Sequence, residues 1–172
     1  MPSAIVTNSE PASTLTDARA GKYLTFHLAN EEFGIRVLKV REIMGLLEIT
    51  AVPQTPPHIK GVINLRGKVV PVIDLRIKFG LPASEYTQRT CIIVTQVQGE
   101  SSSVLMGIIV DGVSEVLNLS AAEIEDTPDF GEDIGGKYLL GMAKSKGKVK
   151  ILLDIDKVLS LQELRDLSEV TR

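Results

Sequence analysis

The feature that most constrains the fold of this chain is an internal repeat. The segment Phe33–Ile43 matches Met106–Val116 at an offset of 73 residues, with identical residues at five of the eleven positions. A second set of matches follows in the same order at an offset of 80 residues. Its pairs are Gly61 with Gly141, Gly67 with Gly147, Lys68 with Lys148, Val69 with Val149, and Asp74 with Asp154. Ordered self-similarity of this kind indicates two related structural units in tandem.

The spacing of the repeat also predicts how the two units are joined. The second copy is longer by seven residues, which we place in the polar stretch Asp126–Gly136. Two units of about 65 residues each would be marginally stable alone, so we expect them to share a hydrophobic core. We place their boundary near residues 85–89, with exchange of strands between the units left open. A groove where the units meet would be a natural binding site.

Composition and periodicity indicate an all-β fold. Hydrophobic residues make up 44% of the chain but aromatic residues only 4%, so Val, Ile and Leu must form the core. Leu24, Phe26 and Leu28 alternate with polar or amphipathic residues, which is the period of a half-buried strand. By the same reasoning we expect strands over 22–28, 33–37, 62–65, 69–73, 90–97, 104–110, 113–119, 138–143 and 149–153.

The remaining segments are predicted as tail, helix or ambiguous structure. Residues 1–20 have no apolar period and are typical of a disordered tail, so the ordered domain should span 21–160. Asp74 is placed to cap a short helix, and capping-box spacing begins at Ser120 and Ser160. The box at Ser160 would open a C-terminal helix over 161–172. Residues 38–44 fit either a helical face or a bulged strand.

The sequence offers little for catalysis or for metal binding. The net charge is −3 and the charges are interspersed, which argues against nucleic acid as a partner. His27 and His58 have no metal-ligand spacing, and one cysteine excludes an internal disulfide. Asp74 and Asp154 could be an acid and base pair, although their equivalent places in the repeat favour helix caps. We therefore expect a binding module with no catalytic residue, cofactor or metal.

The two copies differ most at a predicted hairpin turn. The first copy has Arg66 before the turn glycine, where the second has Lys146. An arginine fixed at a tight turn can make bidentate contacts that a lysine cannot make. Glu42 is the candidate partner of Arg66, and a solvated hairpin charge is the alternative.

Three segments then resemble the signature segments of the CheW family of chemotaxis coupling proteins. They are Gly61–Gly67, Val70–Arg76 and Val110–Val116, and the likeness extends over about Tyr23 to Leu159. The resemblance implies two SH3-like, five-stranded β-barrels packed together. It also implies a cytoplasmic adaptor without enzymatic activity, recruited to membrane-associated arrays without membrane insertion. Its partners would be the cytoplasmic tip of methyl-accepting chemoreceptors and the regulatory domain of the histidine kinase CheA.

The resemblance also points to binding residues. The receptor groove between the barrels would contain Val37, Val40, Glu42, Ile43, Arg66, Cys91 and Val116. The kinase side would contain Glu125, Asp129 and Phe130, where Phe130 is an aromatic residue in an acidic loop. If Phe130 were exposed it would anchor the interface, whereas if it packed into the barrel its loss would destabilise the fold.

Two other functions stay open at this stage. The same coupling role could serve a chemosensory pathway other than swimming, because the signature residues would be shared. A tandem-barrel enzyme or small-ligand binder would instead need titratable groups that converge on one pocket, with Asp74, Asp111 or Arg66 as candidates.

Overall fold

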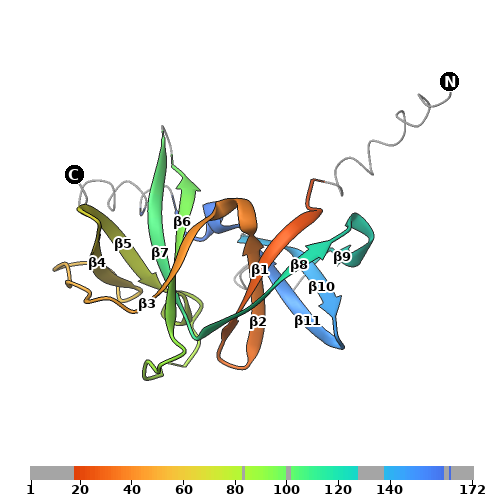
Figure 1. The fold of residues 1–172 in the computed structure, drawn as a ribbon, viewed down its shortest axis with the longest axis horizontal. Helices are drawn as coiled ribbons and strands as arrows, with labels where there is room; N and C mark the ends of the chain where they lie inside the picture. The colour runs from red at the N-terminus through yellow and green to blue at the C-terminus, as the bar shows by residue number, and fades with distance from the viewer. Residues whose placement is uncertain (1–17, 83, 100–101, 128–137, 161–162, 164–172) are drawn as a thin grey trace.

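The computed structural model describes residues 18–82, 84–99, 102–127, 138–160 and 163. Within these ranges the chain forms mostly strands, joined by turns and short helical segments (Figure 1). The strands are β1 (Gly21–Leu28), β2 (Glu31–Arg36), β3 (Val40–Gly45), β4 (Ile59–Leu65), β5 (Lys68–Asp74), β6 (Cys91–Gln98), β7 (Ser103–Val110), β8 (Gly112–Leu119), β9 (Ile124–Glu125), β10 (Leu139–Ser145) and β11 (Lys148–Leu153). The helical segments are η1 (Val37–Lys39), α3 (Leu75–Lys78), η2 (Ala121–Glu123) and η4 (Ile155–Lys157).

The strands form two sheets whose strands follow the same order. One sheet has the order β8-β1-β2-β11-β10-β9 and the other β3-β6-β7-β5-β4. Each contains one parallel pair, β2 with β11 and β7 with β5. Figure 1 shows the two sheets next to each other, each strongly curled. The predicted all-β fold of two related barrel subdomains is therefore confirmed, and we call them the six-stranded and the five-stranded barrel.

The sixth strand of one barrel was not expected from the sequence. In β9, Glu125 pairs with Met142 of β10. At the equivalent place in the five-stranded barrel, Thr50 makes an isolated bridge to Val62 of β4. The same backbone pairing is thus present in both copies. It extends over two residues in β9, which makes a short strand, and over one residue at Thr50.

The two barrels exchange strands. The N-terminal strands β1 and β2 belong to the same sheet as β8 to β11, whereas β3 to β7 form the other sheet. Residues 85–89 connect β5 to β6, and both of these strands lie in the five-stranded barrel. The chain therefore crosses between the barrels twice, once through η1 and once between β7 and β8.

Each crossing is held by an ion pair to the short helix that follows a hairpin. Arg76 of α3 binds Asp111 at the β7–β8 junction, with Nε 2.9 Å from Oδ1. Lys39 of η1 binds Asp156 of η4, with Nζ 2.7 Å from Oδ2. Asp156 occupies the repeat position of Arg76. In both copies this position therefore forms an ion pair with the crossing segment, but with the opposite charge.

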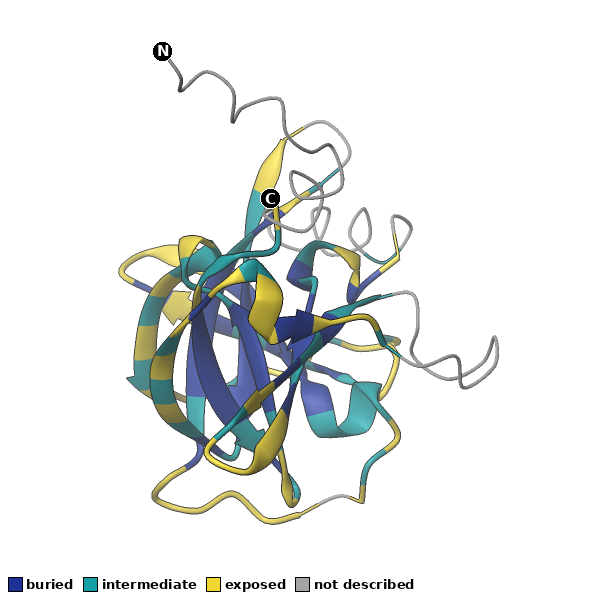
Figure 2. Cartoon of the chain, turned by 90° about the vertical axis from the view of Figure 1, so that its right-hand side faces the viewer, coloured by how far each residue is buried: buried dark blue, intermediate teal, exposed yellow. Residues whose placement is uncertain are grey.

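The core has three parts, and the largest is shared by both barrels. It contains residues from both sheets, such as Phe26 and Ile35 of one and Ile73 and Ile108 of the other. Smaller clusters lie inside each barrel, around Ile63 and Val72 and around Tyr23 and Leu152. Figure 2 shows the buried strands in the interior with exposed residues on turns and outer faces. The shared core expected from the small size of each unit is confirmed.

Helix capping follows the sequence where the structure describes it. The Asp74 carboxylate accepts hydrogen bonds from the backbone N–H groups of Arg76 and Ile77. Ser120 and Glu123 form a reciprocal capping box at η2. Ser160 and Glu163 make the same two contacts at 2.9 and 3.1 Å. The predicted N-terminal tail and the rest of the C-terminal helix lie almost entirely outside the described residues.

Candidate functional site

The predicted hairpin presents Arg66 at its tip. Strands β4 and β5 are joined by Arg66 and Gly67, whose φ angles are +52° and +87°. Two positive φ angles in a two-residue loop define the turn whose twist suits a β-hairpin, and glycine takes such an angle without steric cost. Asn64 Oδ1 also accepts a hydrogen bond from the Gly67 N–H at 2.8 Å. The turn geometry and this hydrogen bond together fix the backbone position of Arg66.

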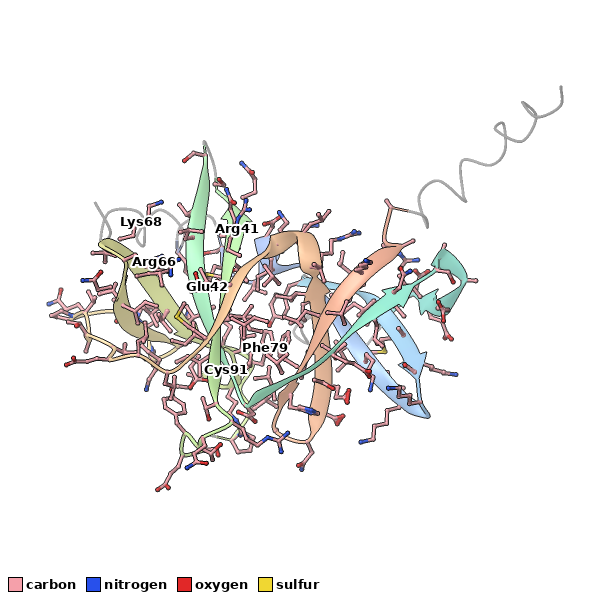
Figure 3. All side chains as sticks on the ribbon, viewed as in Figure 1. Arg41, Glu42, Arg66, Lys68, Phe79 and Cys91 are labelled. Carbon is pink, nitrogen blue, oxygen red and sulfur yellow. The ribbon has the colours of Figure 1, made fainter. Side chains whose placement is uncertain are left out.

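Arg66 forms a bidentate ion pair with Glu42 of β3. Its Nη2 lies 2.6 Å from Glu42 Oε1, and its Nη1 lies 3.1 Å from Oε2. Figure 3 shows the two side chains meeting between β3 and the β4–β5 hairpin. The hydrogen bonds from Arg66 lower the pKa of Glu42, and those same bonds raise the pKa of Arg66. The site therefore keeps both charges over the whole physiological range.

The segment before this pair is a short 3-10 turn followed by a bulged strand. Of the two structures that the sequence allowed here, the bulged strand is confirmed, because the register against β6 shifts between Val40 and Glu42. Along β3, Val40, Glu42 and Met44 are partly buried and alternate with exposed residues. Ile43 is one of these, and its side chain is open to solvent. The edge strand thus carries the glutamate of the ion pair and, at the next residue, an exposed aliphatic side chain.

The other residues predicted for the receptor groove divide into two groups. Val37, Val40 and Cys91 are partly buried and pack against the shared core. Burial raises the pKa of the Cys91 thiol, so this cysteine is a packing residue and a poor nucleophile. Val116 lies on β8 of the six-stranded barrel, where it is exposed. The structure therefore brings Glu42 and Arg66 into contact and places Val116 on the other barrel.

Of the residues predicted for the kinase side, only Glu125 is described. It is exposed on β9, with one carboxylate oxygen 4.0 Å from Lys144 Nζ of β10. Asp129 and Phe130 lie outside the described residues.

Several contacts in the structure were not expected from the sequence. Glu115 and Lys146 form a second ion pair at 2.8 Å, at the repeat positions of Glu42 and Arg66. The two offsets of the repeat contain the signal that could have predicted it. His58, whose sequence spacing fits no metal site, has Nε2 2.7 Å from Glu163 Oε2. No local sequence pattern predicts that contact, because the two residues are 105 positions apart.

The described residues line a small cavity at the border of the two barrels. This cavity of about 180 Å³ is lined by Arg36, Lys39, Leu140, Leu153, Asp154, Ile155 and Asp156. This is smaller than the roughly 300 Å³ at which small-molecule sites usually begin. None of the residues predicted for the receptor groove lines it. Among the described residues, no three His, Cys, Asp or Glu side chains gather as a metal site.

The chain matches known proteins over almost the whole described region. The family model of the CheW-like domain matches residues 22–163. This chain belongs to the CheW-like family. The chemotaxis protein CheW of Klebsiella aerogenes is 42% identical over 151 residues, which are 88% of this chain and 89% of that protein. The chemotaxis protein CheW of Rhizobium meliloti is 36% identical over 140 residues, which are 81% of this chain and 88% of that protein.

A solved structure supports membership of the CheW-like family. The crystal structure of the scaffolding protein TtCheW from Thermoanaerobacter tengcongensis superposes with a TM-score of 0.74. It is 33% identical, and the match covers 84% of this chain and 97% of TtCheW. The CheW-like domain begins within β1 and includes both barrels, so the family resemblance inferred from three short motifs is confirmed. No helix in the described part of this domain is long and apolar enough to cross a membrane.

Proposed function

We propose that this chain is a chemotaxis scaffold that couples methyl-accepting chemoreceptors to the histidine kinase CheA. It acts by holding its partners in position and catalyses no reaction. The observation that carries the proposal is the Glu42–Arg66 pair, which joins an edge strand to a hairpin tip in a CheW-like domain. An edge strand that carries both this fixed charge pair and the exposed Ile43 suits recognition of a protein surface.

The receptor tip binds along β3 and the border of the shared core. The partly buried Val37, Val40 and Cys91 supply an apolar base, and Ile43 supplies an exposed contact. Arg66 is already oriented by Glu42, so little side-chain entropy is lost when a receptor group binds to it. Val116 extends this surface onto the six-stranded barrel.

The regulatory domain of CheA binds the six-stranded barrel near β9. Glu125 is exposed there and supplies an acidic rim, which favours basic groups on the kinase. Asp129 and Phe130, which follow it in the sequence, complete the proposed surface. Receptor and kinase would then bind to different regions of one scaffold.

Coupling requires that the scaffold bind two receptor states differently. A scaffold can shift the kinase between activities only by the difference in its contacts with those states. Because the chain holds the kinase against the receptor tip, a small receptor movement changes the contacts that the scaffold makes and so shifts the activity of the kinase. This places the working protein in receptor arrays on the cytoplasmic side of the membrane.

The experiment is a kinase assay with purified components. CheA autophosphorylation is measured with receptor-bearing membranes, with and without this chain, and attractant is added at the end. Strong activation that attractant suppresses is the expected result. When Arg66→Ala is tested in this assay, Lys68→Ala serves as its matched control, because Lys68 lies on the same hairpin. Absence of any activation by the folded chain, with its cognate receptor and kinase, would exclude the proposed role.

A further inference from the structure

Arg19 ties the start of the six-stranded barrel to the end of β9. Its Nη1 donates a hydrogen bond to the Leu140 carbonyl oxygen of β10 at 3.0 Å. The same Nη1 lies 3.1 Å from Asp126 Oδ1, and Asp126 directly follows β9. Figure 1 shows the start of β1 and strand β9 at the same end of this barrel. One side chain thus contacts both β10 and the residue at which the chain leaves β9.

The backbone around Arg19 is held by two side chains of the same barrel. Tyr23 is fully buried, and its hydroxyl donates a hydrogen bond to the Arg19 carbonyl oxygen at 2.6 Å. Arg36 of β2 donates a hydrogen bond to the Ala18 carbonyl oxygen, and its guanidinium lies 5.6 Å from the centre of the Tyr23 ring. Because its backbone is already fixed, Arg19 loses less conformational entropy when its side chain forms these contacts.

Gly141 leaves the space in which Arg19 and β9 meet β10. A Cβ atom at this position would lie 2.7 Å from the Glu125 carbonyl oxygen and 3.0 Å from Arg19 Nη1. Both distances are shorter than the roughly 3.5 Å at which non-bonded heavy atoms pack without repulsion. The absence of a side chain at Gly141 therefore lets β9 and the guanidinium approach the same residue of β10.

Strand β9 has few contacts of its own. It has two residues, whose partners are Met142 and Ala143 of β10, and it lies at the edge of the sheet. The five-stranded barrel has a single bridge at this place, between Thr50 and Val62. The longer pairing thus occurs in the barrel in which Arg19 adds its contacts. Because an exposed ion pair contributes little to global stability, we expect Arg19 to act mainly on the local position of β9.

We propose that Arg19 is a positioning residue for the kinase, which holds β9 against β10 so that Glu125 is presented to CheA. The inference rests on the proposed function, because that function assigns Glu125 to the kinase side. Glu125 is 64% exposed, and its only described ionic partner, Lys144, is 4.0 Å away, so its carboxylate is free to meet basic groups. Arg19 instead directs its guanidinium at Leu140 and Asp126. Without Arg19, β9 would be loosened, and binding of CheA would have to order it again.

The test is a double-mutant cycle on the binding of purified CheA, measured by isothermal titration calorimetry. We expect Arg19→Ala and Glu125→Ala each to weaken binding about fivefold, because a loosened β9 presents the glutamate poorly. The double variant should bind no more weakly than Glu125→Ala, since Arg19 acts through β9. Arg89→Ala is the matched control and should bind like wild type, because Arg89 is an exposed arginine between β5 and β6 of the other barrel. Circular dichroism melting verifies that every variant is folded.

A second measurement separates positioning from a general effect on the fold. Binding of a soluble receptor fragment, which the proposed function places along β3, should be unchanged in Arg19→Ala. Wild-type affinity of Arg19→Ala for CheA, or equal losses for CheA and receptor, would overturn the positioning role. A double variant weakened by the product of the two single effects would overturn it too, because Arg19 would then act independently of Glu125.

Failure of the proposed function would give a different result. Absence of CheA binding by the wild-type chain would overturn that function together with this inference. An unchanged affinity in Glu125→Ala, with binding by the wild-type chain intact, would overturn the kinase contact at β9 and the positioning role of Arg19, and would leave the receptor side untouched.

Discussion

Lys150 of β11 is buried directly opposite Glu32 of β2, and the two side chains form an ion pair. The equivalent position in the five-stranded barrel is Val70, which lies in the core of that barrel. One copy of the repeat thus has an aliphatic side chain where the other has a charge. A buried charge is tolerated only when its partner is present, because desolvation otherwise dominates.

Removal of Lys150 alone should destabilise the protein strongly. Lys150→Met leaves the Glu32 carboxylate without its partner, and we expect a loss of about 3 kcal/mol in the free energy of unfolding. Urea denaturation at neutral pH measures this change. Lys148→Met, on the exposed part of the same strand, should change stability by less than about 0.5 kcal/mol. The double variant Lys150→Met, Glu32→Gln should recover part of the loss, and equal stability of Lys150→Met and the control would contradict the prediction.

The same pair should contribute a pH-dependent part of the stability. The hydrogen bond from Lys150 lowers the pKa of Glu32 in the folded chain, despite the opposing effect of burial. A lowered folded-state pKa gives stability that is present above the unfolded value, about 4.3, and is lost as the pH falls through the folded value. The stability gap between wild type and Glu32→Gln should therefore be large at pH 7 and should narrow as the pH falls below the unfolded value and through the lowered folded value. Urea midpoints across this range measure it, and a gap that stays constant would refute the assignment.

The repeat allowed much of the fold to be predicted, because it is carried by residues with strict local requirements. Gly67 marks the hairpin turn and Asp74 the helix cap, and both follow from local chemistry. Lys150 could not be placed in this way. Its partner Glu32 lies 118 residues earlier, and the parallel pairing of β11 with β2 that joins them depends on the strand exchange.

The candidate site was predictable to a similar extent. Glu42 and Arg66 could be paired because a tight turn limits where the arginine can reach. The contact between His58 and Glu163 could not be predicted, because it depends on where Glu163, near the C-terminus, lies against the five-stranded barrel. The sequence thus supplied both residues of the Glu42–Arg66 pair, whereas the His58–Glu163 contact depends on tertiary structure.

Gly61 should be far less tolerant of substitution than Gly67. Both have positive φ angles, +143° and +87°, so alanine is strained at either position. A Cβ atom at Gly61 would lie 2.1 Å from the Thr50 carbonyl oxygen, whereas a Cβ at Gly67 meets nothing within 4 Å. We expect Gly67→Ala to cost about 1 kcal/mol and Gly61→Ala about 3 kcal/mol or more. Thermal unfolding compares the two, and equal losses would show that the clash is relieved by backbone movement.

Exchange of the charges at Glu42 and Arg66 should separate stability from signalling. Arg66→Ala removes an exposed side chain at a turn whose backbone is held by Gly67 and Asn64, so the melting temperature should hardly change. Receptor control of CheA should nevertheless be lost in the kinase assay. The double variant Glu42→Arg, Arg66→Glu restores an internal ion pair with the opposite polarity, and we expect it to melt like wild type and still fail to couple. Full coupling by this variant would mean that the pair only closes the five-stranded barrel, since the receptor would then be indifferent to which strand carries the positive charge.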